Sequence, residues 1–423
     1  MNPKEHKKKK GSNTFQTYIH KVLKSQDVHP DMQLSAKAST QLSAFISTVC
    51  KMISGYSQDA CILAKKSTIS SKEIVLGASI ITSGNLKKQM INKINNSLEL
   101  YSKPVEDTKP TRRENRAGLN VSVALCEKFI RRFGHIKVNV AKTASVALAC
   151  VCEYLIAEIL KLAGNGTRDE KKVIIKIRHI YLAILHDEEL RYVMDACKIE
   201  FMGAGVVPHI RQAFLPTSKP SKGKPGSRVL HNIKECQKSQ KLLLQKRPFS
   251  KVISHIAKTY SENVRFGGGF FLALQAFVEQ KVTNLLNTAQ SLALHGKRDG
   301  VNDVDLDLAW KLTEPSIPYI SELGYTQDDG KPLLRKVVDD GIERLSFRGG
   351  VKRKKKLVYE AVRRFIQSLL ETILYRISLF ADNRKVMTFG IKDLKASLET
   401  MNIYYTTYAL KSPKKIKIST KED

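Results

Sequence analysis

The 423-residue chain lacks long apolar segments and is poor in acidic residues. No apolar run approaches the roughly 18 residues of a membrane-spanning helix, so we expect no membrane partner. The basic first ten residues are followed by no apolar stretch, which is not the pattern of a secretory signal. The 40 acidic residues are outnumbered by 72 Lys and Arg, giving a net charge of +32. Such an excess favours polyanionic partners, and nucleic acid is the first candidate.

Cysteine pairs and catalytic motifs are also lacking. The seven cysteines include no CxxC pair, and most of them fall on apolar helix faces. This pattern predicts buried thiols in a reducing compartment and no zinc site. The sequence contains no HExxH, GxSxG or Walker A motif. We therefore expect a protein that is not an enzyme and that uses no metal, no cofactor and no small-molecule substrate.

One pattern is present four times. Each repeat has a short helix, a basic loop, a helix of roughly seven turns, a second loop and another short helix. The second loop and last helix are the clearest parts: Thr68–Ile74, Ile175–Ile180, Val301–Leu306 and Thr388–Leu394. Strand signals are confined to short bridges in the loops, so the predicted class is all-α. Because a long apolar helix cannot bury itself alone, four repeats predict two internally paired modules.

Linkers rich in Pro, Gly, Ser or acidic residues separate the predicted segments. The segments are a basic arm (1–14), a first fold (15–102), a linker (103–115), a second fold with a trailing segment (116–216), a linker (217–226), a third fold with a preceding helix (227–312), an acidic linker (313–334), a fourth fold (335–410) and a basic tail (411–423). The five lysines of the arm leave three interpretations open: a nucleic-acid arm, a nuclear address and a soluble tail.

The first two repeats resemble two of the core histones. In the first repeat, Val28–Asp31 and Lys66–Ile74 are similar to H-two-B. In the second repeat, Arg116–Leu119 and Asp187–Leu190 are similar to H-two-A, and so is the trailing segment that ends at Pro216.

The last two repeats resemble the other two core histones. Val264–Phe266 and His295–Arg298 are similar to H-three, and Arg348–Arg353 and Val358–Glu360 to H-four. The whole chain thus resembles a fused core-histone quadruplet of the kind found in giant DNA viruses. The resemblance implies four histone folds in two intramolecular handshake dimers. Fusion of neighbouring partners raises their effective concentration to roughly millimolar.

The resemblance also implies a DNA-binding surface. In a handshake dimer the first loop of one fold lies beside the second loop of its partner, and helix N-termini there face phosphates. We expect Arg265 and Arg353 to enter the minor groove and Lys352 to bind a neighbouring phosphate. The other expected DNA-binding residues are Lys65, Lys66, Lys171, Lys172, Lys297, Arg298, Arg384 and Lys385 in second loops, and Lys128, Arg131 and Lys251 on first helices. For any single lysine, a solvated surface position is the alternative.

Two protein-binding surfaces follow from the same resemblance. His295, Arg298 and Asp305 match the H-three positions that join two subunits, so a second copy of the chain is an expected partner, and an ordinary surface cluster is the alternative. The residues that match the histone acidic patch are Glu153, Glu158, Asp187, Glu188 and Glu189. Lys161, Lys93 and Asn85 stand where the family carries Glu.

The expected function is structural. Two chains would form an octamer-like core that wraps double-stranded DNA without sequence preference, for viral genome compaction. The alternative is a histone-fold scaffold or a transcription-factor-like protein that does not wrap DNA, and regular nuclease protection would separate the two. The expected location is the virion and the host nucleus or viral factory, or chromosomes if the protein is cellular.

Overall fold

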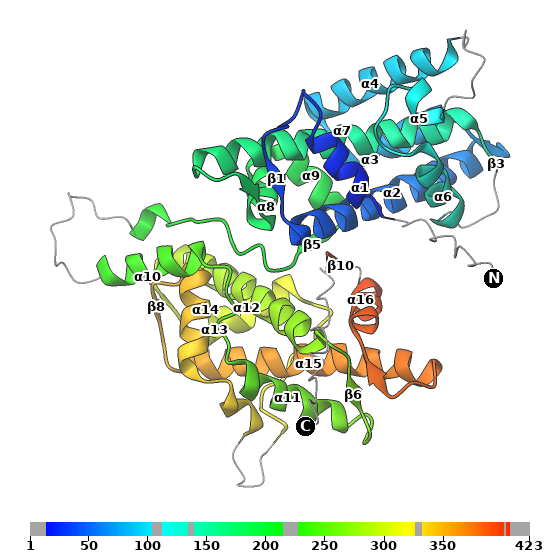
Figure 1. Ribbon diagram of the computed structural model, residues 1–423. Coiled ribbons are helices and arrows are strands. Elements are labelled where there is room, and N and C mark those ends of the chain that lie inside the picture. Colours follow the sequence, from blue (N-terminus) through cyan, green and yellow to red (C-terminus); the bar gives the residue numbers. More distant parts are fainter. Residues whose placement is uncertain are drawn as a thin grey trace, which may run out of the picture. The chain divides into compact units, whose positions relative to one another are not determined.

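The computed structural model describes residues 14–103, 112–133, 139–214, 227–325, 332–401 and 403–406. Over these residues the chain consists of helices joined by loops with strands of two or three residues, which confirms the all-α class. The predicted linker 217–226, the tail 411–423 and all of the basic arm except Thr14 lie outside the described residues. The chain divides into an N-terminal unit, Met1–Ile199, and a C-terminal unit, Glu200–Asp423, which are described separately (Figure 1).

The N-terminal unit contains two repeats. The first consists of α1 (Gln16–Leu23), β1 (Gln33–Leu34), α2 (Ala36–Leu63), β2 (Thr68–Ile69) and α3 (Ser71–Ile81), followed by α4 (Gly84–Ser102). The second consists of α5 (Arg113–Arg116), α6 (Val123–Phe133), β3 (Asn139–Val140), α7 (Lys142–Asp169), β4 (Ile174–Ile175) and α8 (Ile177–His186), followed by α9 (Glu188–Ala196). Helix α7 packs against α1, α3 and α4, and α2 packs against α6 and α8. Each long helix is therefore covered by the partner repeat.

The C-terminal unit contains the other two repeats, and β5 (Ile199–Phe201) lies at its start in the sequence. The third repeat consists of α10 (Ser227–Lys238), α11 (Lys246–Lys258), β6 (Arg265–Phe266), α12 (Phe270–His295), β7 (Gly300–Val301) and α13 (Asp303–Thr313). The fourth consists of α14 (Asp339–Arg348), β8 (Arg353–Lys354), α15 (Leu357–Asn383), β9 (Thr388–Phe389), α16 (Ile391–Thr400) and β10 (Tyr404–Thr406). Single 3-10 turns occur at Gln212–Phe214 and Leu333–Lys336. Here α12 packs against α14, α15 and α16, and α15 against α11 and α13.

The long helices are stable because their apolar stripes are buried by helices of the partner repeat together with helices of their own repeat. On α15, Val362, Phe365, Leu369, Ile373 and Ile377 follow one another at helical spacing, and each is 0% exposed. Burying a side chain of this size favours folding by about 1.5–3 kcal/mol. The sequence thus dictates pairing of the repeats, because an unpaired repeat would expose this stripe to water.

The described part of the acidic linker is packed rather than free. Trp310 donates its indole N–H to the carbonyl of Ile317 at 3.2 Å. Arg364 of α15 donates to the carbonyl of Ser321 at 2.8 Å, and the amide of Gly324 donates to Gln367 at 3.2 Å. The segment between the third and fourth repeats is therefore held against α15.

Candidate nucleic-acid interface

Short parallel strand pairs bring the loops of partner repeats together. The register pairs are Gln33 with Ile174, Thr68 with Asn139, Arg265 with Thr388, and Gly300 with Arg353. In every case the first loop of one repeat lies beside the second loop of its partner. Two such loop pairs lie in each unit, and the predicted cations of the second loops all belong to them.

Two residues after the end of each long helix lies a lysine in the left-handed conformation. The φ angles are +54° at Lys65, +55° at Lys171, +56° at Lys297 and +53° at Lys385. All four close the same hydrogen-bonded turn, in which the lysine amide and the next amide bind two carbonyls of the last helical turn. In α2, for example, the amide of Lys65 donates to Ile62 at 2.9 Å and that of Lys66 donates to Cys61 at 3.0 Å.

These four lysines sit where glycine is the residue of lowest strain. A left-handed conformation costs a residue with a Cβ roughly 1–2 kcal/mol. All four side chains are exposed, so burial of their stems does not offset this cost. All four positions therefore present a positive charge to solvent at a conformational cost.

A second cation in three of the loops is held by the helix that follows. Glu73, Asp305 and Asp393 each accept the amide of the residue three positions earlier, at 2.8–2.9 Å. The same carboxylates bind Lys66, Arg298 and Arg384 at 2.7, 2.7 and 2.6 Å. These three cations remain about half exposed, with side-chain exposures of 52%, 42% and 46%. The loop is thereby fixed while its cation still faces solvent.

The carboxylates of Glu73 and Asp305 stay ionised. Burial alone would raise the pKa of Glu73, but hydrogen bonds from Lys66 and Ser70 lower it to about 2. The hydrogen bond from Arg298 lowers the pKa of Asp305, and the same bond raises the pKa of Arg298. In the second repeat the acid is replaced by His179, whose pKa is lowered by burial, and Lys172 pairs with Glu170 instead.

The two arginines expected in the minor groove lie on strands of these loop pairs. Arg265 is in β6 and Arg353 is in β8, and both side chains are exposed. Within the described residues neither arginine forms an ion pair. Lys352 differs, because its ammonium lies 3.6 Å from Asp299 and 5.1 Å from the ring centre of Phe214.

The predicted cations on the first helices are also at the surface. Lys128 on α6 and Lys251 on α11 are exposed. Arg131 is exposed too, and it binds Glu127 at 2.9 Å one turn earlier on α6. Exposed pairs of this kind contribute little to stability, so Arg131 can exchange Glu127 for a phosphate at low cost.

The structure adds cations that sequence reasoning missed. Lys355 and Lys356 directly precede α15, and Lys142 is the first residue of α7; all three are exposed. In the sequence, the run of cations from Lys352 to Lys356 could have indicated Lys355 and Lys356. Within that run Lys354 is structural, because its side chain is 9% exposed and lies between the rings of Phe347 and Tyr359.

Of the residues expected at the chain–chain interface, His295 is the last residue of α12, Arg298 follows in the loop, and Asp305 lies on α13. His295 is exposed, and Arg298 binds Asp305 through two hydrogen bonds of 2.9 and 2.7 Å. The carboxylate of Asp305 also caps α13, so its removal would disturb the helix itself. An exposed apolar stripe follows on α13: Val304, Leu308 and Leu312 are 69%, 47% and 62% exposed. The stripe, with four-residue spacing, presents one face of the helix to solvent.

Three of the five acidic-patch residues are used internally. Glu153 is buried and accepts the amides of Asn120 and Val121 at 2.6 and 3.0 Å. Glu189 accepts the amides at the start of α4, and Asp187 accepts the amide of Leu190 at the start of α9. Glu188 is exposed and Glu158 partly so. The free acidic surface is therefore smaller than the sequence suggests.

We expect a peptide that anchors an arginine on a histone acidic patch to bind this chain weakly. Lys161 and Lys93 place positive charge where such a peptide needs carboxylates, and like charge disfavours the anchor. Lys161→Glu together with Lys93→Glu should raise peptide affinity about tenfold or more, measured by fluorescence anisotropy.

The matched control is Lys21→Glu with Lys72→Glu, which makes the same change in net charge elsewhere in the N-terminal unit. This control should leave peptide affinity within about twofold. Equal gains in both double variants would mean that net charge, not the patch, governs binding.

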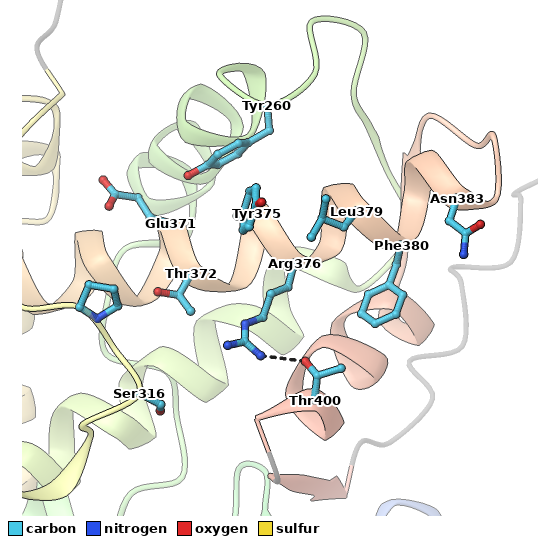
Figure 2. A pocket seen from close by; sticks show the side chains of 11 residues that line it. Tyr260, Ser316, Glu371, Thr372, Tyr375, Arg376, Leu379, Phe380, Asn383 and Thr400 are labelled. Carbon is cyan, nitrogen blue, oxygen red and sulfur yellow. Dashed lines mark hydrogen bonds between the residues drawn. The ribbon is translucent and has the colours of Figure 1, made fainter.

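A groove of a different character lies against α15. Its volume is about 710 Å³, and Figure 2 shows Tyr375, Leu379 and Phe380 along it. Tyr260 lies across it, with its ring 5.8 Å from that of Tyr375. The arginine in the groove, Arg376, donates to the hydroxyl of Thr400 at 3.0 Å. An aromatic and apolar lining suits a protein partner better than DNA.

In the described part of the chain, no helix combines the length and the apolar character that a membrane-spanning segment needs. In the same part of the chain, no three His, Cys, Asp or Glu side chains are placed to hold a metal ion.

Comparison with known proteins identifies the family. The core-histone domain family, which covers H-two-A, H-two-B, H-three and H-four, matches residues 225–312. A histone doublet of Melbournevirus, H-two-B joined to H-two-A, is 32% identical over 202 residues, which are 47% of this chain and 73% of the doublet. Histone H-two-A of Agaricus bisporus is 43% identical over 127 residues, which are 30% of this chain and 88% of that histone. The chain therefore belongs to the core histone family.

Proposed function

We propose that this protein packages double-stranded DNA by binding its backbone without sequence preference. The observation that carries the proposal is the set of four loop pairs, each with an exposed left-handed lysine at the end of a long helix. Cations on paired loops suit phosphates, and arginines on β6 and β8 suit the minor groove each time it faces the protein. The net charge of +32 supports the same partner.

The proposed architecture has four histone folds in the order H-two-B, H-two-A, H-three and H-four. The N-terminal unit would be one handshake dimer and the C-terminal unit the other, with the segment boundaries proposed from the sequence. Support comes from the reciprocal packing of long helices within each unit. Similarity to a viral doublet supports the first two positions in this order.

Two chains together would form the octamer-like core. The exposed stripe of Val304, Leu308 and Leu312 beside His295 supports a contact between two copies through α13. A wrapped particle would compact a viral genome in the virion, the viral factory or the host nucleus.

Salt-dependent binding to unrelated duplexes tests backbone readout. Log affinity should fall linearly with log salt, because bound cations release counterions from DNA. Arg265→Ala or Arg353→Ala should each lower affinity about 3- to 10-fold and the salt slope by about 1, equally on all sequences. Lys311→Ala, which removes a charge on α13 outside the loop pairs, is the control and should leave the slope unchanged. Loss confined to one sequence would contradict backbone readout.

The second candidate function is a histone-fold scaffold that binds proteins and does not wrap DNA. The apolar groove on α15 favours it as an additional property, because the groove suits a protein (Figure 2). The cations on all four loop pairs favour DNA packaging as the main function.

A further inference from the structure

Three thiols from three different helices meet in the core of the N-terminal unit. Cys50 lies on α2, Cys126 on α6 and Cys152 on α7, and all three are 0% exposed. The sulfurs of Cys50 and Cys152 are 3.0 Å apart, and the thiol of Cys126 lies close enough to Cys152 to affect its ionisation. Cys50 and Cys152 belong to the two long helices of partner repeats and are 102 positions apart in the sequence.

The other four cysteines have no comparable arrangement. All seven cysteines lie in the described part of the chain and are reduced there. Cys61 donates to the carbonyl of Lys66 at 3.1 Å, and Cys150 lies 3.6 Å from the hydroxyl of Ser97. Cys197 is buried and Cys236 is half-buried. Among the described cysteines, a close sulfur-to-sulfur contact is thus a particular property of Cys50 and Cys152.

The hydrogen bonds within the cluster make its thiols unequal. Burial and the neighbouring Cys152 raise the pKa of Cys50. Burial opposes ionisation of Cys152 too, but the thiols of Cys126 and Cys50 donate hydrogen bonds to its sulfur and lower its pKa. Cys152 is therefore the thiol of the cluster that forms a thiolate most readily, and the thiolate is the reactive form.

We propose that Cys50 and Cys152 are a redox modification site, which closes to a disulfide joining α2 to α7. The oxidant is a small peroxide. The Cys152 thiolate attacks one peroxide oxygen, the O–O bond breaks, and the released hydroxide takes up a proton to leave as water. Cys50 then attacks the sulfur of the Cys152 sulfenic acid, forming the S–S bond and releasing a second water. Two thiols and one hydrogen peroxide give one disulfide and two waters.

Closing the disulfide between Cys50 and Cys152 needs only a small movement of the two side chains. The sulfurs must approach from 3.0 Å to the roughly 2.05 Å of a disulfide, a shift that side-chain rotation and a slight approach of the helices can supply. The bond would close a ring of about 100 residues, which constrains the unfolded state strongly. It would lock the two partner repeats together when the protein leaves a reducing compartment, and glutathione or thioredoxin would release it again.

The test uses the full-length protein, treated with hydrogen peroxide and analysed by intact mass and by peptide mapping without reduction. We expect a loss of about 2 Da per chain, one Cys50–Cys152 linked peptide, and a melting temperature of the N-terminal unit raised by about 5 °C or more, reversed by dithiothreitol. Cys50→Ser and Cys152→Ser should each abolish the link and the shift. A Cys61→Ser, Cys236→Ser double variant should keep both.

Burial limits the access of the oxidant to the thiols of the folded protein, so a second experiment refolds the protein from denaturant in a glutathione redox buffer. There the thiols are exposed before the disulfide forms. The Cys50–Cys152 link should be the dominant disulfide there as well. A dominant Cys126–Cys152 link would overturn the proposed pairing. Absence of any link to Cys152 in both the peroxide and the refolding experiment would overturn the site.

Discussion

Replacing the four left-handed lysines by glycine should make the protein more stable and a much weaker DNA binder. Glycine adopts positive φ without strain, so each of Lys65→Gly, Lys171→Gly, Lys297→Gly and Lys385→Gly should add about 0.5–1 kcal/mol to the free energy of unfolding. If each of these lysines binds a phosphate, the same four changes remove four phosphate contacts per chain. DNA affinity near 0.15 M salt should therefore fall about 10²- to 10³-fold, and the salt slope by about 3 to 4 per chain.

The chain supplies a matched control for this quadruple variant. Lys198 also has a positive φ of +48° and follows a helix, α9, but lies outside the loop pairs. Lys198→Gly should stabilise the protein and leave the salt slope unchanged. The measurements are thermal unfolding and titration of a mixed-sequence duplex across a salt series. If the quadruple variant binds DNA as tightly as the wild type, the left-handed lysines are not part of the DNA interface.

Making the exposed stripe of α13 polar should halve the particle. Leu308→Gln with Leu312→Gln changes two exposed side chains without altering charge or the capping carboxylate of Asp305. If two chains meet through this stripe, loss of apolar contact should leave one chain per complex, protecting about half the DNA length. Mass photometry and nuclease digestion measure the two quantities.

The control for the interface variant is Val338→Gln with Leu357→Gln, which changes two apolar side chains 42% and 59% exposed elsewhere in the same unit. Its particles should remain full-size. If the α13 variant also gives full-size particles, two copies do not meet through this stripe. A simple change of His295 and Asp305 to alanine would be harder to interpret, because Asp305 also holds the start of α13.

The sequence predicted the helices well because apolar periodicity decides them. Each repeat was expected to contain a helix of roughly seven turns, and in the first repeat α2 runs over the 28 residues from Ala36 to Leu63. The side chain of Ser35 accepts the amide of Ala38, which is the reason that the helix begins there. Loop pairing followed from the family resemblance rather than from periodicity.

The sequence could not predict which charged side chains are used internally. Glu153 was expected in an acidic surface but is buried, because the turn before α6 presents two amides to it. Lys354 was one of a run of five cations from Lys352 to Lys356, yet aromatic rings enclose it. The left-handed lysines were hidden for a similar reason, since glycine is the usual signal for that conformation.

The ends of the wrapped DNA should be held loosely. The resemblance to H-three implies that the helix before the third fold presents arginines to the entering and leaving DNA. At this place α10 instead has the exposed His231 and Glu235, with Lys234 as the remaining cation. Two chains carry twice +32, against roughly 290 phosphates on a full wrap of about 146 bp. Bending DNA costs a few kcal/mol per turn-scale segment, and terminal contacts are the last to offset that cost. A wrap of clearly less than full length follows.

The length of DNA that the purified protein protects from nuclease on random-sequence duplex tests DNA packaging most directly. We predict a discrete fragment near 120 bp, shorter than the roughly 146 bp of a full histone wrap. Glu235→Arg with His231→Arg should lengthen it. A fragment of full length with the wild-type protein would contradict the claim that the DNA ends are held loosely. Digestion to a continuous smear, with no discrete fragment, would contradict DNA wrapping itself.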